Sequence, residues 1–243
     1  RSFIASLVAR GVTDVVVSPG SRSQALALAS AEAESAGHLS LHVVIDERSA
    51  GFRALGLAQE TGVPAVAIAT SGSAPAHFLP AVMEAHHAGV PLIVVSADRP
   101  ASLRGAGANQ TTQHEGLFGF AASTMSSVAE GPSADSAGTA AAIAVFDEAS
   151  RGRAVHANIE FSEPLSSSDD SAFVVPTLPE PATPSVEPTV ANLEPEAGTL
   201  VIAGHGAGAR AEQWAVDLGA PLIAEVVSGA RFGPHLLPAY RQG

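Results

Sequence analysis

Polar and charged side chains follow four short apolar runs of the sequence, each at the point where a run gives way to a turn. These turns span residues 18–23, 46–51, 70–74 and 96–100. If the runs are parallel strands, their carboxyl ends share one edge of a sheet, which is where ligands of open α/β sheets bind. The coincidence of four such turns favours a binding site at this edge.

Glu47 is the residue in these turns that could transfer a proton. It follows the apolar run that ends at Ile45, so it stands at the mouth of the expected site. A carboxyl group that is partly removed from water can give or take a proton near neutrality. The alternative is an ordinary helix start, because capping and the helix dipole both favour acids there.

Two arginines and two amides could bind a carboxylate. The planar guanidinium groups of Arg22 and Arg99 suit bidentate hydrogen bonding to a carboxylate. Asn109 and Gln110 lie in a long loop after residue 100, and loops of this length are usually functional or disordered. The alternatives are a surface position for Arg22 and an ion pair of Arg99 with Asp98.

Two further patterns are weaker. The pair His86 and His87 lies among Ala and Val without a carboxylate at helical spacing, so we expect no metal site in this chain. The glycine-rich run 204–208 resembles a dinucleotide-binding loop, but its G-x-G-x-x-G spacing is incomplete. A tight turn between a strand and a helix is the better interpretation of that run.

Composition excludes several classes of chemistry. The 243 residues contain no cysteine and no lysine, which excludes disulfides, thiolate metal sites, a P-loop lysine and a Schiff-base lysine within this chain. The net charge of −12 disfavours binding to nucleic acid. No apolar run approaches the roughly 18 residues of a membrane helix and no signal peptide is visible, so we expect a cytoplasmic protein without membrane insertion.

Short apolar, β-branched runs alternate with alanine-rich stretches of helical length. This alternation predicts an α/β fold, a doubly wound parallel sheet with helices on both faces. Nearly continuous apolar strands indicate burial on both faces of the sheet. The expected strands span 14–18, 41–45, 64–69, 91–96, 121–128 and 155–161, and the expected helices span 24–36, 48–60, 74–88 and 136–151.

The composition changes after Pro164. Residues 1–165 are expected to form the first domain, and the Pro- and Ser-rich stretch 166–198 an extended linker. Residues 199–243 begin a second α/β domain with strands at 200–203 and 221–227 and a helix at 211–218. Because a domain usually has about 100 residues or more, we expect this second domain to be cut short.

Six ordered motifs between about Val8 and Pro164 resemble one family. They are SPGSRS, IDERSAGFRALGLA, TSGSA, PLIVVSADRP, GANQT and HANIEFSEPL, and the likeness continues more loosely through LVIAGHGAG. The chain resembles the N-terminal half of the SEPHCHC synthases, the thiamin-diphosphate enzymes that make 2-succinyl-5-enolpyruvyl-6-hydroxy-3-cyclohexene-1-carboxylate in menaquinone biosynthesis. The first domain would then be of the pyrimidine-binding type.

This resemblance implies a cofactor site. Glu47 matches the family's catalytic glutamate, which hydrogen-bonds the aminopyrimidine ring of thiamin diphosphate. The turn formed by Thr70, Ser71, Gly72 and Ser73 would also contact the cofactor. The Mg²⁺ ligands of the family lie in a C-terminal diphosphate-binding domain that this sequence does not include, so the fragment alone is expected to be inactive.

The resemblance also implies substrates and partners. The enzymes decarboxylate 2-oxoglutarate and add the succinyl unit to isochorismate in a 1,4 manner. The matches to Ser21, Arg22, Arg99, Asn109 and Gln110 contact isochorismate or line its pocket. Since the cofactor of related enzymes lies between two subunits, we expect a homodimer or homotetramer.

Two positions depart from the family pattern, and two other functions stay open. Ser73 replaces a more usual Thr and keeps the hydroxyl, whereas Glu160 stands where an apolar residue or proline is more usual and has no functional interpretation. The first alternative is another thiamin-diphosphate carboligase or decarboxylase. The second is a non-catalytic binding module of the same fold, against which the intact Glu47 argues.

Overall fold

The computed structural model describes residues 1–128, 133–165, 171–179 and 196–240 of the chain. The chain divides into two compact units, Arg1–Ala182 and Thr183–Gly243. Within the described ranges, no helix combines the length and apolar character that crossing a bilayer requires.

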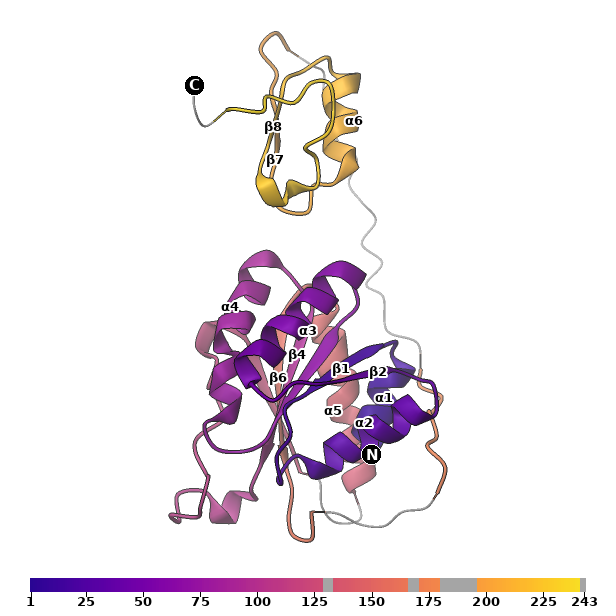
Figure 1. Ribbon diagram of the computed structural model, residues 1–243, viewed down its shortest axis with the longest axis vertical. Helices are drawn as coiled ribbons and strands as arrows, with labels where there is room; N and C mark the ends of the chain where they lie inside the picture. The colour runs from indigo at the N-terminus through magenta and orange to yellow at the C-terminus, as the bar shows by residue number, and fades with distance from the viewer. Residues whose placement is uncertain (129–132, 166–170, 180–195, 241–243) are drawn as a thin grey trace. The chain divides into compact units, whose positions relative to one another are not determined.

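The first unit is built on a six-stranded sheet in which all paired strands run parallel (Figure 1). Its order is β2-β1-β3-β4-β6-β5. Every residue of β3, β4 and β6 is buried, as expected of parallel strands covered on both faces, and this confirms the predicted fold class. The strands are β1 (Asp14–Val17), β2 (Ser40–Val43), β3 (Ala65–Ala69), β4 (Leu92–Asp98), β5 (Ser123–Val128) and β6 (Ala154–Glu160).

Helices cover both faces of this sheet (Figure 1). The first face packs against α1 (Ser2–Ala9), α2 (Gln24–Ser35) and α5 (Ala134–Ala149). The second face packs against α3 (Glu47–Thr61) and α4 (Leu79–Ala88). Successive strand residues alternate between two cores, since Val15 and Val17 enter the first and Val16 enters the second.

Small side chains bring α3 close to the sheet. Its buried residues are all glycine or alanine, namely Ala50, Gly51, Ala54 and Ala58. A Cβ on Gly51 would lie 3.1 Å from the Phe78 ring, so any larger residue would push the helix outward. This close packing places the first turn of α3, with Glu47, beside the carboxyl edge of the sheet.

The order of the strands places a reversal of winding between β1 and β3. The chain leaves β1 through α2 to β2 on one side, then returns through α3 to β3 on the other side. At such a reversal of winding the two connecting segments diverge and leave room at the carboxyl ends of the strands. The turns after β1 and β3 therefore flank the expected ligand position.

Two elements differ from the sequence-based expectation. The strand–helix alternation gives no indication of α1, because α1 precedes the first strand. The helix expected at 74–88 is divided into a 3₁₀ helix, η1 (Ala74–Phe78), and α4. The division falls before Pro80, which has no N–H for the preceding turn and fits only the first turn of an α-helix.

The second unit contains a parallel pair, β7 (Val201–Ala203) and β8 (Leu222–Ala224), joined by α6 (Ala209–Asp217). The three expected elements are present here, although β8 ends at Ala224 and the 3₁₀ helix η4 (Val226–Ser228) follows it. A small core holds the unit together, formed mainly by Ala203, Ala211, Ala215 and Leu222.

The predicted boundaries at 1–165, 166–198 and 199–243 stay a prediction. Of the proposed linker, residues 166–170 and 180–195 lie outside the described residues. The described stretch 171–179 lies along the first unit, where Phe173 packs against the first core and the carbonyl of Pro179 accepts a hydrogen bond from Arg10 at 3.0 Å.

Candidate functional site

The turns that follow β1 and β3 are in direct contact. A Cβ on Gly20 would lie 2.6 Å from Thr70 Cγ2, so only glycine allows this approach. The backbone N–H of Ser18 donates to the carbonyl of Ile68 at 2.8 Å. The structure thus brings the first and third predicted turns together at the carboxyl ends of β1 and β3.

Glu47 lies at the start of α3 beside the same edge. The segment that leads to Glu47 is tied to the end of β1, because the Ser18 hydroxyl donates to the Val44 carbonyl at 2.9 Å. The N-cap is Asp46, which accepts from the backbone N–H of Ser49 at 2.8 Å, and that hydrogen bond lowers the pKa of Asp46. Glu47 is half-buried, and its carboxylate has no hydrogen-bond or ion-pair partner among the described residues. It is therefore available to a ligand.

Arg99, Ser71 and Gln110 form a cluster at the ends of β3 and β4. Arg99 Nη1 donates to the Ser71 hydroxyl and to the Gln110 carbonyl, each at 2.8 Å. Gln110 Nε2 donates back to the Ser71 carbonyl at 3.1 Å. Gly72 has a positive φ of 75°, and a Cβ there would lie 2.7 Å from Gln110 Cγ, so glycine is required where the loop crosses the turn.

The alternative interpretations of the two arginines are wrong. Arg22 is not a surface residue, since its side chain is 10% exposed and binds the Phe161 carbonyl at 2.9 Å and the Glu163 carboxylate at 3.1 Å. The Arg99 guanidinium does not pair with Asp98 among the described contacts. Asp98 instead accepts from the backbone N–H of Arg99 at 2.8 Å and from Arg104.

Ser21, Ser73 and Asn109 are exposed at this edge. Within the described part of the chain, none of their side chains makes a hydrogen bond. Thr70 is buried, and its hydroxyl is likewise without a partner among the described residues. Ser21, Thr70 and Ser73 lie in the predicted turns and Asn109 in the loop after β4, and no hydrogen bond to a described residue orients their polar side-chain atoms.

A buried polar network beneath the turns is absent from the sequence-based prediction. His114 lies at the centre of it, with no exposed surface, and its Nε2 donates to the Gly72 carbonyl at 3.0 Å. Its Nδ1 lies 3.0 Å from Oδ1 of Asn158 on β6. The sequence did contain one signal of this network, namely the alternation of His156, Asn158 and Glu160 in an otherwise apolar strand. Polar groups on one buried face of a strand must find hydrogen-bond partners.

His156 is the second imidazole of this network and is neutral. Burial and, secondarily, the charge of His114 lower the pKa of His156 from 6.5 to about 3. The Ser96 hydroxyl donates to Asn158 and lies 2.7 Å from His156 Nε2, so it accepts the proton of that nitrogen. His156 Nδ1 then accepts from Thr124 at 3.1 Å, which assigns the tautomer.

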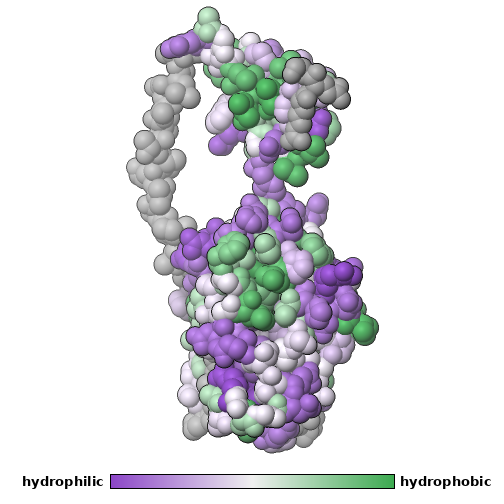
Figure 2. Space-filling model, turned by 90° about the vertical axis from the view of Figure 1, so that its left-hand side faces the viewer, coloured by the Kyte–Doolittle hydropathy of each residue, from purple (hydrophilic) through white to green (hydrophobic). Residues whose placement is uncertain are grey.

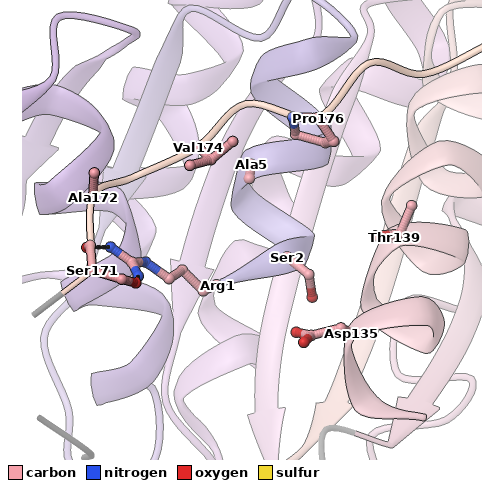
Figure 3. Close-up of a pocket in the computed structure, with 9 residues that line it drawn as sticks. All are labelled: Arg1, Ser2, Ala5, Asp135, Thr139, Ser171, Ala172, Val174 and Pro176. Carbon is pink, nitrogen blue, oxygen red and sulfur yellow. Dashed lines mark hydrogen bonds between the residues drawn. The ribbon is translucent and has the colours of Figure 1, made fainter. Parts of the chain in front are cut away.

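Two cavities of the first unit lie away from the predicted site turns. One of about 290 Å³ lies among α1, α5 and the segment 171–176, where the Arg1 side chain reaches Ser171 (Figure 3). A second of about 450 Å³ lies between α2 and the same segment. No predicted site residue lines either cavity. Among the residues that the structure describes, no group of His, Asp and Glu could hold a metal ion.

Comparison with known proteins finds a family model that matches the part of the chain containing this edge of the sheet. Residues 1–119 match the family model of the N-terminal TPP-binding domain of thiamine pyrophosphate enzymes. This matched segment includes β1 to β4 and every predicted site residue.

Curated relatives are similar over nearly the whole chain. The 2-succinyl-5-enolpyruvyl-6-hydroxy-3-cyclohexene-1-carboxylate synthase of Leifsonia xyli is 47% identical over 99% of this chain and 43% of its own length. The enzyme of the same name from Arthrobacter sp. is 46% identical over 99% of this chain and 42% of its own length. That of Dechloromonas aromatica is 37% identical over 97% of this chain and 46% of its own length.

The chain therefore spans less than half the length of these relatives. Its first unit has the parallel α/β sheet expected of the matched domain, with the predicted site turns at one edge. Residues 1–119 of this chain are therefore similar to the N-terminal TPP-binding domain of thiamine pyrophosphate enzymes, in sequence and in the class of fold.

Proposed function

We propose that the full-length protein carrying this chain decarboxylates 2-oxoglutarate and adds the succinyl unit to isochorismate in a 1,4 manner, as a transferase of menaquinone biosynthesis. The observation that carries the proposal is the 47% identity, over 99% of this chain, to a synthase of that name. When bound, thiamin diphosphate supplies the carbon nucleophile and the electron sink that decarboxylation of a 2-oxo acid requires.

The residues at the carboxyl ends of β1 and β3 fit the aminopyrimidine part of this cofactor. Glu47 offers a half-buried carboxylate without a partner among the described residues, which suits accepting a hydrogen bond from a ring nitrogen and holding its proton. Thr70 is a buried residue whose hydroxyl makes no hydrogen bond to a described residue. Together with Ser71, Gly72 and Ser73, these residues form our proposed cofactor contacts, with Glu47 as the catalytic residue.

The arginines and amides at the same edge fit the carboxylates of the proposed substrates. Arg99 has one nitrogen engaged by Ser71 and Gln110, so Nε and Nη2 remain for a carboxylate. We assign isochorismate binding to Arg99, Arg22, Ser21, Asn109 and Gln110. For Arg22, the contacts with Phe161 and Glu163 orient the guanidinium beside the β1 turn.

The proposal also covers the metal ion, the cellular compartment and the self-association of the full-length protein. We assign Mg²⁺, or Mn²⁺ in its place, to ligands outside this chain, and we place the enzyme in the cytoplasm. For self-association as a homodimer or homotetramer, the support is a set of exposed apolar side chains on adjacent helices α3 and α4, namely Phe52, Leu79 and Met83. Figure 2 looks onto the side of the first unit that carries α4, where green apolar side chains form a patch among purple polar ones.

A substrate screen on the purified full-length protein with thiamin diphosphate and Mg²⁺ tests the function. We expect consumption of 2-oxoglutarate that depends on isochorismate. Formation of acetolactate from pyruvate would instead identify a different carboligase of the superfamily. Absence of turnover with either substrate set, together with absence of thiamin diphosphate binding in calorimetry, would identify a non-catalytic module.

A further inference from the structure

The loop that follows β4 carries three of the proposed substrate residues but has little apolar support. Most residues between 101 and 110 are exposed, and Leu103 is 43% exposed. Its only regular structure before residue 114 is the three-residue 3₁₀ helix η2 (Ala101–Leu103). Burial of side chains therefore cannot hold this loop in one conformation, and polar contacts must do so.

Two buried carboxylates lie under the start of the loop. Asp98 ends β4 and Glu160 ends β6, and the two residues are directly opposite each other in the parallel register. The Asp98 side chain is fully buried and that of Glu160 is 9% exposed. Two neighbouring anions removed from water require a compensating cation.

Arg104 supplies that cation from within the loop. Its Nη1 lies 3.4 Å from Asp98 Oδ2, and its Nη2 donates to Glu160 Oε1. The planar guanidinium can satisfy two carboxylates at once, which an ammonium group does less well. The loop is thereby tied to the ends of two central strands.

The remaining carboxylate oxygens hold the loop backbone. Asp98 Oδ1 accepts from the N–H of Arg99 at 2.8 Å, and Glu160 Oε2 accepts from the N–H of Ala101 at 3.1 Å. Both acids therefore bind the loop twice, once through its backbone and once through Arg104. This gives Glu160 a structural explanation, which the sequence alone did not provide.

The far end of the loop returns to the same point. His114 binds the Gly72 carbonyl and faces Asn158, whose Nδ2 donates to Asp98 Oδ2 at 3.0 Å. Both ends of the loop, at residues 99 and 114, are consequently anchored around Asp98. The stretch between them carries Asn109 and Gln110.

We propose that Arg104, through Asp98 and Glu160, is a positioning residue that fixes the loop 99–114 and thereby orients Arg99 for a carboxylate ligand. Apolar residues of similar volume often replace a buried ion pair without loss of stability, so stability alone does not account for charged groups here. The directional hydrogen bonds of these charged groups to the loop account for their presence. The substrate role of Arg99 rests on the proposed function, whereas the anchoring of the loop does not.

Amide hydrogen exchange of the full-length protein tests the anchor directly. In Arg104→Met, we expect exchange of the segment 99–114 to rise at least about tenfold, with β3 and α4 unchanged. The matched control is Arg151→Met, which removes an exposed arginine paired with Glu148. Unchanged exchange in 99–114, or a uniform rise across the first unit, would overturn the proposal.

A double variant tests whether Arg104 and Glu160 act together. Glu160→Gln keeps an oxygen that can accept from Ala101 but removes the charge. If Arg104 acts through Glu160, exchange of 99–114 in the double variant will be no faster than in Arg104→Met alone. If the increases in exchange rate caused by the two substitutions multiply in the double variant, Arg104 and Glu160 act independently and the linkage is refuted.

Steady-state kinetics of the full-length enzyme separates positioning from chemistry. We expect Arg104→Met to raise KM for isochorismate at least about tenfold and to change kcat much less. Faster loop exchange with an unchanged KM would refute the positioning role. If the parent protein shows no isochorismate-dependent turnover but Arg104→Met still exchanges faster in the loop, the proposed function is refuted. The role of Arg104 in anchoring the loop then stands.

Discussion

Arg99 donates from the same nitrogen, Nη1, to the Ser71 hydroxyl and to the Gln110 carbonyl, at 2.8 Å in both cases. Ser71 follows β3, and Gln110 belongs to the loop after β4, so one guanidinium connects two elements of the carboxyl edge. Its plane is held before a ligand arrives, which lowers the conformational cost of binding. Nε and Nη2 remain available, since neither bonds to a described residue.

This geometry predicts the effect of Arg99→Lys in the full-length enzyme. Lysine retains the charge but cannot hold Ser71 and Gln110 while presenting a bidentate pair of donors. We expect KM for isochorismate to rise at least about tenfold in steady-state assays. Arg153→Lys on the exposed surface is the control and should behave as the parent protein. Retention of the parent KM in Arg99→Lys would remove the carboxylate-binding assignment.

The free carboxylate at the start of α3 predicts the effect of Glu47→Gln. Glutamine keeps the size of the side chain but cannot hold a proton from the cofactor ring. We expect kcat to fall by about 10²- to 10⁴-fold in the full-length enzyme. Glu60→Gln, an exposed position on the same helix, is the matched control. Activity of Glu47→Gln equal to that of the control would exclude a catalytic role.

The contact between the first and third turns predicts opposite effects of two glycine substitutions. Gly20→Ala introduces a methyl group against Thr70 and should destabilise the first unit by about 1–3 kcal/mol. Gly56→Ala on α3 meets no atom within 4 Å and should stabilise it by up to about 1 kcal/mol.

Urea unfolding followed by far-UV circular dichroism measures both glycine variants. Tryptophan fluorescence is unsuitable, because the single tryptophan, Trp214, lies in the second unit. Equal stabilities of Gly20→Ala and Gly56→Ala would contradict the close approach of the two turns.

The buried imidazole of His156 predicts a loss of stability in acid. Its pKa is about 3 in the folded chain, against 6.5 for the group in water. As the pH falls below 6.5, the unfolded chain binds a proton that the folded chain does not bind, so unfolding becomes more favourable. The contribution is on the order of 2 kcal/mol between pH 7 and pH 5.

Comparison with His156→Gln isolates this contribution, because glutamine has polar atoms for hydrogen bonding but does not titrate. Urea unfolding at pH 7 and pH 5 should show a larger loss of stability in the parent chain than in the variant. The same pH dependence in both proteins would contradict a neutral, buried His156.

Much of the fold could be predicted from local patterns. Apolar β-branched runs, alanine-rich helices and the residues between them predict six strands of the first unit close to their observed bounds, because hydrophobic periodicity is encoded within each element. The location of Glu47, Ser71 and Arg99 at strand ends also follows, since all strands of a parallel sheet point their carboxyl ends to one edge. Helix α1 was not predicted, because it precedes the first strand and so lies outside the strand–helix alternation.

The contacts among those residues required the tertiary structure. The sequence by itself determined the α/β class, the site turns and their chemical types, which depend on neighbours along the chain. Only the folded structure decided that Gly20 meets Thr70, that Arg22 reaches Phe161, and that Asp98 and Glu160 share Arg104. The physical reason is that strand order and buried polar pairing join residues far apart in the sequence, such as Arg22 and Phe161, which are 139 positions apart, and local periodicity carries no information about such pairs.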